Sequence, residues 1–235
     1  MTKLILMMTL LCSQVASASL TSPFPSTVEG IDIPNTHALS DNIIRGMAPL
    51  GKMGQLVDYG ITDILIFKNQ TRSEIDQEYS ELKEVLADTS IDTYQYDFYW
   101  HDYPSYKVAC EQTIDALRVM RAVNEDNNRK LFYHCTVGED RTGFLSGLWR
   151  MLSQNWSKKK AFYKEMCENG YANGNPNKPD YVVGEIREDL TPLFLYMSDK
   201  IESGKLKLSN LTKSICKDEI PLNIKIMYCR SSSKI

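Results

Sequence analysis

The sequence has no surplus of basic residues. Its 235 residues include 27 lysine and arginine against 30 aspartate and glutamate, which gives a formal net charge of −3. A protein that binds nucleic acid non-specifically usually carries a basic excess, so nucleic acid is not an expected partner. The composition is 43% hydrophobic and 24% charged, which is typical of a globular protein and excludes collagen-like, disordered and coiled-coil classes.

Long apolar runs are also lacking. The run over residues 4–11 is too short to cross a bilayer as a helix, and no later segment is apolar over membrane length. The run follows Lys3 and precedes the small-residue pattern Ala16-Ser17-Ala18, an order that is typical of a secretory signal peptide. We therefore expect residues 1–18 to be removed after Ala18 and the protein to be secreted or periplasmic, with no membrane span.

Cysteine is scarce, with six residues in the whole sequence and an odd number beyond the expected signal peptide. Beyond the expected signal peptide the chain keeps five cysteines, which are Cys110, Cys135, Cys167, Cys216 and Cys229. An odd number in an exported protein leaves at least one free thiol or an intermolecular pair. Cys216 could pair with Cys229 and Cys110 with Cys167, but the sequence alone does not decide the connectivity.

Hydrophobic patterns alternate between strands and helices after residue 41. Residues 19–41 are rich in Ser, Thr and Pro and predict an extended lead-in. Beyond them, strands are expected at 42–45, 63–67, 92–98 and 131–133, and helices at 52–60, 74–87, 106–124, 142–154 and 157–168. Such alternation predicts one α/β domain over residues 42–235, with a central mixed sheet and helices on both faces. Apolar residues over 180–203 predict further helices, so the C-terminal half is expected to be helical.

The residues that carry chemistry follow the last predicted strand. They read His134-Cys135-Thr136-Val137-Gly138-Glu139-Asp140-Arg141-Thr142-Gly143. Backbone N–H groups after Cys135 and the start of the next helix would form a nest for a tetrahedral oxyanion, and Gly138 would allow the turn. Arg141 offers a planar fork that can grip two phosphate oxygens. The same positive field would lower the pKa of Cys135, whose thiolate is a nucleophile.

The pattern His-Cys-x5-Arg-Thr resembles the phosphate-binding loop of the cysteine-dependent protein tyrosine and dual-specificity phosphatases. Two further segments, Arg45-Gly46-Met47-Ala48-Pro49 and residues 60–66, resemble the opening part of compact members of that superfamily. The resemblance covers most of the chain beyond the signal peptide. It implies a dual-specificity-phosphatase-like fold and a phosphomonoesterase that needs no metal and no other cofactor.

The resemblance also implies a role for each part of the loop. Cys135 would be the nucleophile and Arg141 the phosphate clamp. Thr142 would stabilise the thiolate as a leaving group, and His134 would fix the loop by hydrogen bonds. The remaining residues expected to bind phosphate are Thr136, Val137, Gly138, Glu139 and Asp140. The three histidines of the chain show no metal-ligand spacing with cysteine or acidic residues, which agrees with a metal-free site.

Cleavage of a phosphate monoester also needs an acid for the leaving oxygen. Members of the superfamily carry this Asp on a mobile loop upstream of the nucleophile, often after Trp-Pro. Here Trp100-His101-Asp102 stands at the matching separation from Cys135, with His in place of Pro. Asp102 is therefore the expected general acid. Asp97 is the alternative, although it is expected to lie within a strand.

The substrate is defined less sharply than the reaction. A secreted enzyme of this size resembles the bacterial protein-tyrosine-phosphatase-like phytases, which implies hydrolysis of inositol polyphosphates such as phytate. The candidate cations for such a small-molecule polyanion are Arg45, Lys52, Lys68, His101 and Lys107. Glu139 and Asp140 depart from the Lys often found in this loop in phosphoinositide-preferring relatives. We therefore expect a site that is small or only mildly positive.

The sequence alone is consistent with two other functions. The protein could be a phosphotyrosine or dual-specificity protein phosphatase, in which case its partner is a phosphoprotein. It could also be a non-catalytic phosphate-binding module, although the presence of Cys135, Arg141 and Asp102 together argues against that reading.

Overall fold

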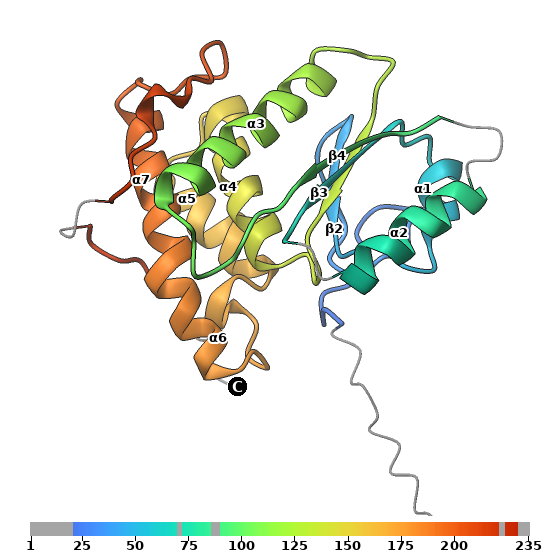
Figure 1. Ribbon diagram of the computed structural model, residues 1–235, viewed down its shortest axis with the longest axis horizontal. Helices are drawn as coiled ribbons and strands as arrows, with labels where there is room; N and C mark the ends of the chain where they lie inside the picture. The colour runs from blue at the N-terminus through green and yellow to red at the C-terminus, as the bar shows by residue number, and fades with distance from the viewer. Residues whose placement is uncertain (1–20, 70–71, 86–89, 221–223, 230–235) are drawn as a thin grey trace, which may run out of the picture.

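A five-stranded sheet crosses the middle of the molecule (Figure 1). The computed structural model describes residues 21–69, 72–85, 90–220 and 224–229, and the predicted signal peptide lies outside them. The strands are β1 (His37–Ser40), β2 (Ile43–Gly46), β3 (Asp63–Phe67), β4 (Asp92–Tyr96) and β5 (Leu131–His134), in the order β1-β2-β5-β3-β4. β1 runs antiparallel to β2 and the other neighbours are parallel, so the sheet is mixed, as predicted.

Helices cover both faces of the sheet (Figure 1). One face carries α1 (Met53–Asp58) and α2 (Arg72–Val85), and the other carries α3 (Tyr106–Asn124), α4 (Asp140–Gln154) and α7 (Thr191–Glu202). Shorter elements complete the C-terminal half, namely α5 (Lys158–Lys160), η1 (Ala161–Met166), η2 (Cys167–Asn169), η3 (Ala172–Gly174), α6 (Asp180–Glu185), η4 (Ile186–Leu190) and η5 (Lys213–Ile215). The predicted α/β class and the helical C-terminal half are confirmed. Of the helices in the described part of the chain, none combines the length and apolarity that a membrane crossing requires.

Strand β3 explains how one sheet supports two cores. Its residues from Ile64 to Phe67 are fully buried. Leu65 and Phe67 belong to the larger core with α3, α4 and α7, whereas Ile64 and Ile66 belong to the smaller core with α1 and α2. Successive residues of a strand point to opposite faces, so a strand covered on both sides needs an uninterrupted apolar run. Because β2, β5, β3 and β4 are parallel, the loops that follow them meet at one edge.

The segment 21–41 is more structured than the predicted extended lead-in. Its end forms the edge strand β1, in which Ala38 pairs with Ile44 of β2. Ile31 and Ile33 are buried in the smaller core. A strand of four residues is too short for its alternation to stand out in the sequence, and it forms here because β2 offers an open edge for pairing.

Two disulfides connect distant parts of the helical layer. Cys110 pairs with Cys216, and Cys167 pairs with Cys229. The two pairings that the sequence left possible, Cys216 with Cys229 and Cys110 with Cys167, do not form, because the fold brings other cysteines together. Cys135 is the free cysteine among the described residues, which agrees with the odd count.

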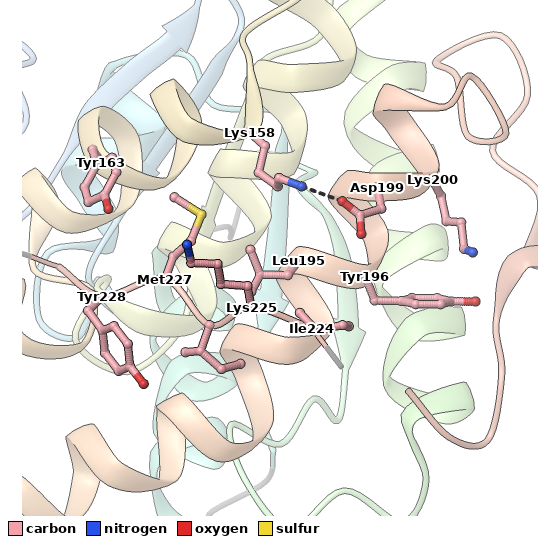
Figure 2. Close-up of a pocket in the computed structure, with 11 residues that line it drawn as sticks. Lys158, Tyr163, Leu195, Tyr196, Asp199, Lys200, Ile224, Lys225, Met227 and Tyr228 are labelled. Carbon is pink, nitrogen blue, oxygen red and sulfur yellow. Dashed lines mark hydrogen bonds and ion pairs between the residues drawn. The ribbon is translucent and has the colours of Figure 1, made fainter. Parts of the chain in front are cut away.

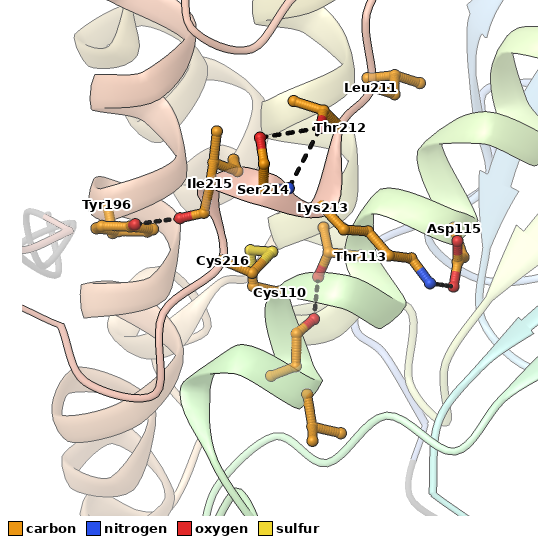
Figure 3. The surroundings of a disulfide bond; sticks show 12 residues. Cys110, Thr113, Asp115, Tyr196, Leu211, Thr212, Lys213, Ser214, Ile215 and Cys216 are labelled. Carbon is orange, nitrogen blue, oxygen red and sulfur yellow. Dashed lines mark hydrogen bonds and ion pairs between the residues drawn. A yellow bond between two sulfur atoms is a disulfide. The ribbon is translucent and has the colours of Figure 1, made fainter.

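Packing of the chain after α7 against α3 produces the first disulfide (Figure 3). Lys213 of η5 reaches the carboxylate of Asp115 in α3, with Nζ and Oδ2 2.5 Å apart. The hydroxyl of Tyr196 in α7 donates to the carbonyl oxygen of Ile215. These contacts hold the end of η5 between α3 and α7, where the two cysteine Cα atoms lie 5.6 Å apart.

Candidate active site

The loop between β5 and α4 forms a candidate phosphate site at the carboxyl edge of the sheet. Residues 135–139 make the turn, and α4 begins at Asp140 and runs for 15 residues. The first N–H groups of such a helix lack intrahelical acceptors and carry a partial positive charge, which suits an anion. Ala48, after β2, donates its backbone N–H to the carbonyl oxygen of Thr136 at 3.0 Å. Thr136 and Val137 are half-buried.

Gly138 occupies a place in the loop where no side chain fits. Its φ is +72°, and a Cβ atom there would meet backbone atoms of Gly46 and Met47 at 2.7 Å. Its carbonyl oxygen accepts hydrogen bonds from the guanidinium of Arg45 and from the side-chain amide of Asn35, the latter at 3.0 Å. The glycine predicted for conformational freedom is therefore also required for the close approach of two backbone segments.

Arg45 supports this loop from β2 and does not face the substrate side as predicted. Its side chain is fully buried. Besides the loop carbonyl, Nη1 donates to Oε1 of Glu165 at 3.1 Å and to Oγ of Ser146 at 3.2 Å. Glu165 also contacts His37 and Arg150, each at 2.9 Å. A guanidinium committed to a buried cluster of this kind is not available to a polyanion, which corrects the prediction for Arg45.

Cys135 is a buried thiol at the base of the loop, 2% exposed. Its backbone N–H donates to Oγ1 of Thr142 at 2.9 Å. Burial disfavours the ionised form, but the positive charge of Arg141 and hydrogen bonds from Thr142 outweigh burial, so the pKa of the Cys135 thiol is lowered. A lowered pKa increases the fraction of the nucleophilic thiolate at neutral pH.

Three hydrogen bonds to protein groups hold Arg141 in place. Its Nη1 donates to Oδ1 of Asn69 at 2.6 Å and to the carbonyl oxygen of Phe98 at 3.3 Å. Its Nη2 donates to Oγ1 of Thr136 at 3.2 Å. Arg141 is buried, with 7% of the residue exposed, and its charge acts on the thiol of Cys135. The loop thus combines a thiol and a fixed cation, as the sequence predicted for an anion site.

The two acidic residues of the loop are engaged by Lys178. Its Nζ lies 2.5 and 2.6 Å from the carboxylate oxygens of Asp140 and 3.1 Å from Oε2 of Glu139. Glu139 also accepts hydrogen bonds from Asn175 at 3.0 Å and from Ser22 at 2.9 Å. Burial raises the pKa of Glu139, although Lys178 acts in the opposite direction. Both carboxylates therefore contact protein groups, and Glu139 is fully buried whereas the side chain of Asp140 is 13% exposed.

His134 connects the loop to a buried ion pair. Its Nδ1 lies 3.0 Å from the carbonyl oxygen of Cys135, which can only accept, so this nitrogen carries the proton. Its Nε2 lies 3.8 Å from Oε2 of Glu78, and Lys68 donates to the other oxygen of Glu78 at 2.8 Å. Burial lowers the pKa of His134, so the ring is neutral at neutral pH. Lys68, predicted as a substrate cation, is committed to Glu78.

Asp102, the predicted general acid, lies on the exposed loop between β4 and α3. Its side chain is 87% exposed, and Oδ2 lies 2.8 Å from Nδ1 of His101. Its backbone has a positive φ of 51°, and its N–H donates to Oδ2 of Asp189 at 2.9 Å. In the described part of the chain, no hydrogen bond or ion pair joins this carboxylate to the phosphate loop. The start of the same loop does reach the site, through the Phe98 carbonyl that Arg141 contacts.

Asp97 and Lys107 lie at the two ends of this loop. β4 ends at Tyr96, so Asp97 stands just beyond the strand in which it was predicted. Its carbonyl oxygen accepts a hydrogen bond from Gln112 of α3 at 3.2 Å. Lys107 is exposed in the first turn of α3. The structure therefore brings the residues from His134 to Thr142 together and leaves the candidate acids and Lys107 toward solvent.

Three residues of the site were not predicted from the sequence. Asn69 is part of an Asn-Gln-Thr triplet, a pattern of surface glycosylation that does not suggest contact with Arg141. Asn35 falls in the segment that was predicted as a lead-in. A cation such as Lys178 could have been expected from one feature of the sequence, because two adjacent carboxylates inside an anion-binding loop require a cation nearby.

A separate groove of about 700 Å³ lies between α7 and the segment 224–228 (Figure 2). In it, Nζ of Lys158 lies 2.5 Å from Oδ1 of Asp199, and Nζ of Lys200 lies 4.5 Å from the centre of the Tyr196 ring. None of its described lining residues belongs to the phosphate loop or to the loop that carries Asp102. It is therefore distinct from the candidate active site.

No protein-family model and no curated protein matches the chain. Similar solved structures include the core catalytic domain of the PP-IP phosphatase SIW14 from S. cerevisiae, with 21% identity, 74% of this chain and 94% of that chain covered, and a TM-score of 0.46. TpbA from P. aeruginosa is 16% identical over 70% of this chain and 91% of that chain, with a TM-score of 0.46. Human DUSP28 is 14% identical over 73% and 95%, also with a TM-score of 0.46.

Proposed function

We propose that this protein is a cysteine-dependent phosphatase that hydrolyses phosphate monoesters through a cysteinyl-phosphate intermediate. The main observation behind the proposal is the free thiol of Cys135 in the loop that precedes α4. Its pKa is lowered by the positive charge of Arg141, in the first turn of that helix. Catalysis of phosphoryl transfer consists mainly of positioning and of charge stabilisation, and a thiolate, a fixed guanidinium and loop N–H groups supply both.

The first step transfers the phosphoryl group to the enzyme. The thiolate of Cys135 attacks phosphorus, and the P–S bond forms as the bond to the leaving oxygen breaks. Arg141 and the loop N–H groups hold the three other oxygens. Asp102 gives its proton to the leaving oxygen, which requires its exposed loop to turn toward the site.

The second step returns the enzyme to its initial state. A water molecule attacks phosphorus, and Asp102, now a carboxylate, takes the proton that the water loses. The P–S bond breaks and its electron pair returns to Cys135. The hydroxyl of Thr142, beside the thiol, stabilises the departing thiolate. Inorganic phosphate is released.

We further propose that the enzyme is exported and acts on inositol polyphosphates such as phytate. The predicted signal peptide supports export, and so do the two disulfides, since such bonds persist in oxidising compartments. The resemblance to the phytase-like branch supports the substrate class. With Arg45 and Lys68 in buried ion pairs, Arg141 is the cation that acts at the thiol, so we expect the site to grip one phosphate group of the ring.

Phosphate release measured in parallel from phytate, a phosphotyrosine peptide and a phosphoinositide tests the proposal. We expect release from phytate, reduced at least about 10³-fold in Cys135→Ser, while that variant still binds inorganic phosphate. Release from the peptide alone would replace the substrate class. Release from none of the three would leave a phosphate-binding module, and turnover retained in Cys135→Ser would refute the mechanism.

A further inference from the structure

The phosphate loop contains two carboxylates, which is unfavourable for a site that takes an anion. Glu139 and Asp140 directly precede Arg141 in the sequence. The charge of Asp140 raises the pKa of the Cys135 thiol, against the effect of Arg141. Without compensation, the two carboxylates would repel an incoming phosphate and favour the protonated thiol.

Lys178 provides the compensating charge from outside the loop. An ammonium group has three N–H donors. Here Nζ contacts both carboxylate oxygens of Asp140, Oε2 of Glu139 at 3.1 Å, and the carbonyl oxygen of Gly170 at 2.8 Å. The side chain of Lys178 is 6% exposed. Its donors are therefore committed to the protein, and it is not a free cation for the substrate.

The segment 170–178 holds the same carboxylates through further contacts. The backbone N–H of Ala172 donates to Oδ1 of Asp140 at 2.8 Å, and the amide of Asn175 donates to both oxygens of Glu139, at 3.0 and 3.1 Å. Exposed ion pairs contribute little because water screens them, but this one is nearly excluded from solvent. The arrangement is therefore a built part of the loop and not an incidental surface pair.

We propose that Lys178 is a positioning residue that holds the two carboxylates of the phosphate loop and offsets part of their negative charge. Arg141 then acts on the incoming phosphate and on Cys135 against a smaller opposing charge. Lys178 touches neither the substrate nor the reacting atoms, and it acts through Asp140 and Glu139. The inference deepens the proposed function and rests on it for the effect on turnover, whereas the effect on the thiol stands without it.

Five variants separate this role from a merely structural one. Lys178→Met removes the charge, Lys178→Arg keeps it, and Asp140→Asn removes one of the matched carboxylates. The double variant Lys178→Met/Asp140→Asn removes both partners. Lys164→Met is the matched control, because this lysine is 61% exposed and pairs with Glu168 on the surface. The readouts are the pH dependence of Cys135 alkylation by iodoacetamide, the affinity for inorganic phosphate, and KM and kcat on the substrate.

Lys178→Met is expected to raise the alkylation midpoint by about one pH unit and to weaken phosphate binding about tenfold. KM should rise more than kcat falls, because the uncompensated carboxylates repel the anionic substrate as it binds. Asp140→Asn alone should shift the midpoint in the opposite direction, since it removes a carboxylate whose charge raises the pKa of the Cys135 thiol. The double variant should lie closer to the wild type than Lys178→Met does, and Lys178→Arg and Lys164→Met should stay near the wild type.

An unchanged midpoint in folded Lys178→Met, or a double variant no closer to the wild type, would overturn the inference. Should Lys178→Met not fold, Asp140→Asn decides, and a midpoint that does not fall overturns it. Alkylation needs no turnover. A chain that showed these shifts but released phosphate from no ester would refute the proposed function and leave the role of Lys178 intact.

Discussion

The guanidinium of Arg45 donates a hydrogen bond to the carbonyl oxygen of Gly138, which lies 93 residues further along the chain. The contact joins the end of β2 to the phosphate loop that follows its neighbour β5. The glycine has a left-handed φ, and the arginine is fully buried. The conformation of the loop is thus supported by the sheet itself, so its N–H groups need little rearrangement when a phosphate binds.

Gly138→Ala is expected to disturb this loop strongly. A Cβ atom at residue 138 would lie 2.7 Å from backbone atoms of Gly46 and Met47, which cannot move as a flexible side chain would. We expect a loss of about 1–3 kcal/mol in the free energy of unfolding and a marked rise in KM. Urea unfolding and steady-state kinetics measure the two effects.

Gly184→Ala is the matched control for that substitution. Gly184 lies in α6, and a Cβ atom there would have no neighbour within 4 Å. We expect an unchanged KM and up to about 1 kcal/mol of added stability, because alanine favours the helix more than glycine does. Equal effects of the two substitutions would contradict the account of Gly138.

Glu165 is predicted to make the fold sensitive to acid. Burial acts to raise the pKa of Glu165, but hydrogen bonding to His37 and the charges of Arg45 and Arg150 outweigh it and lower the pKa from 4.5 to about 2. A carboxyl group with a lowered pKa stabilises the fold above the pKa of the unfolded chain, and this stability is lost as the pH falls through that of the folded state. The affected window therefore runs from about pH 4.5 down to about 2.

The comparison of Glu165→Gln with the exposed control Glu168→Gln tests this window. We expect Glu165→Gln to lose about 3–5 kcal/mol at neutral pH, because it leaves the buried Arg45 without its carboxylate partner. The gap between this variant and the wild type should shrink as the pH falls from 4.5 to 2, whereas Glu168→Gln should follow the wild type throughout. A gap that stayed constant in unfolding experiments across this range would exclude Glu165 as the titrating group.

The two disulfides are predicted to differ in their effect on the site. Each closes a long loop, with sequence separations of 106 for Cys110–Cys216 and 62 for Cys167–Cys229, so replacing either pair by serine should cost about 2–5 kcal/mol of stability. Cys167 precedes the segment 170–178, which holds the loop carboxylates. We therefore expect the loss of Cys167–Cys229, and not of Cys110–Cys216, to weaken binding of inorganic phosphate. Calorimetric titration of both double variants at a temperature where each is folded checks this, and equal affinities would contradict it.

Local sequence patterns were sufficient to predict the features whose residues lie close together along the chain. The apolar run of β3 predicts a strand buried on both faces. The order Cys135, Gly138, Arg141 between a strand and a helix predicts an anion site, because all of its groups lie within one turn of the chain.

The partners of that loop could not be predicted, because they come from distant segments. Lys178 follows Asp140 by 38 residues, and Asn35 precedes Gly138 by 103. Only the packing of η2, η3 and the N-terminal segment around the loop brings them together. The burial of Arg45 could not be predicted for the same reason. The sequence shows a cation at this position but does not show that Glu165, a distant residue, pairs with it.

Asp102 is the expected proton donor for the leaving oxygen. The side chain of Asp102 is 87% exposed, so Asp102→Asn should leave the melting temperature unchanged while removing the acid. We expect a fall of about 10²–10⁴-fold in kcat for an alkyl phosphate such as phytate, whose leaving oxygen needs a proton. The burst of p-nitrophenolate that reports the first step with p-nitrophenyl phosphate should stay nearly as fast as in the wild type, because this leaving group departs as an anion. Its steady-state turnover should fall, because the second step still needs Asp102 as a base. Asp97→Asn is the matched variant at the other candidate, and a selective loss with the alkyl phosphate in that variant instead would assign the acid to Asp97.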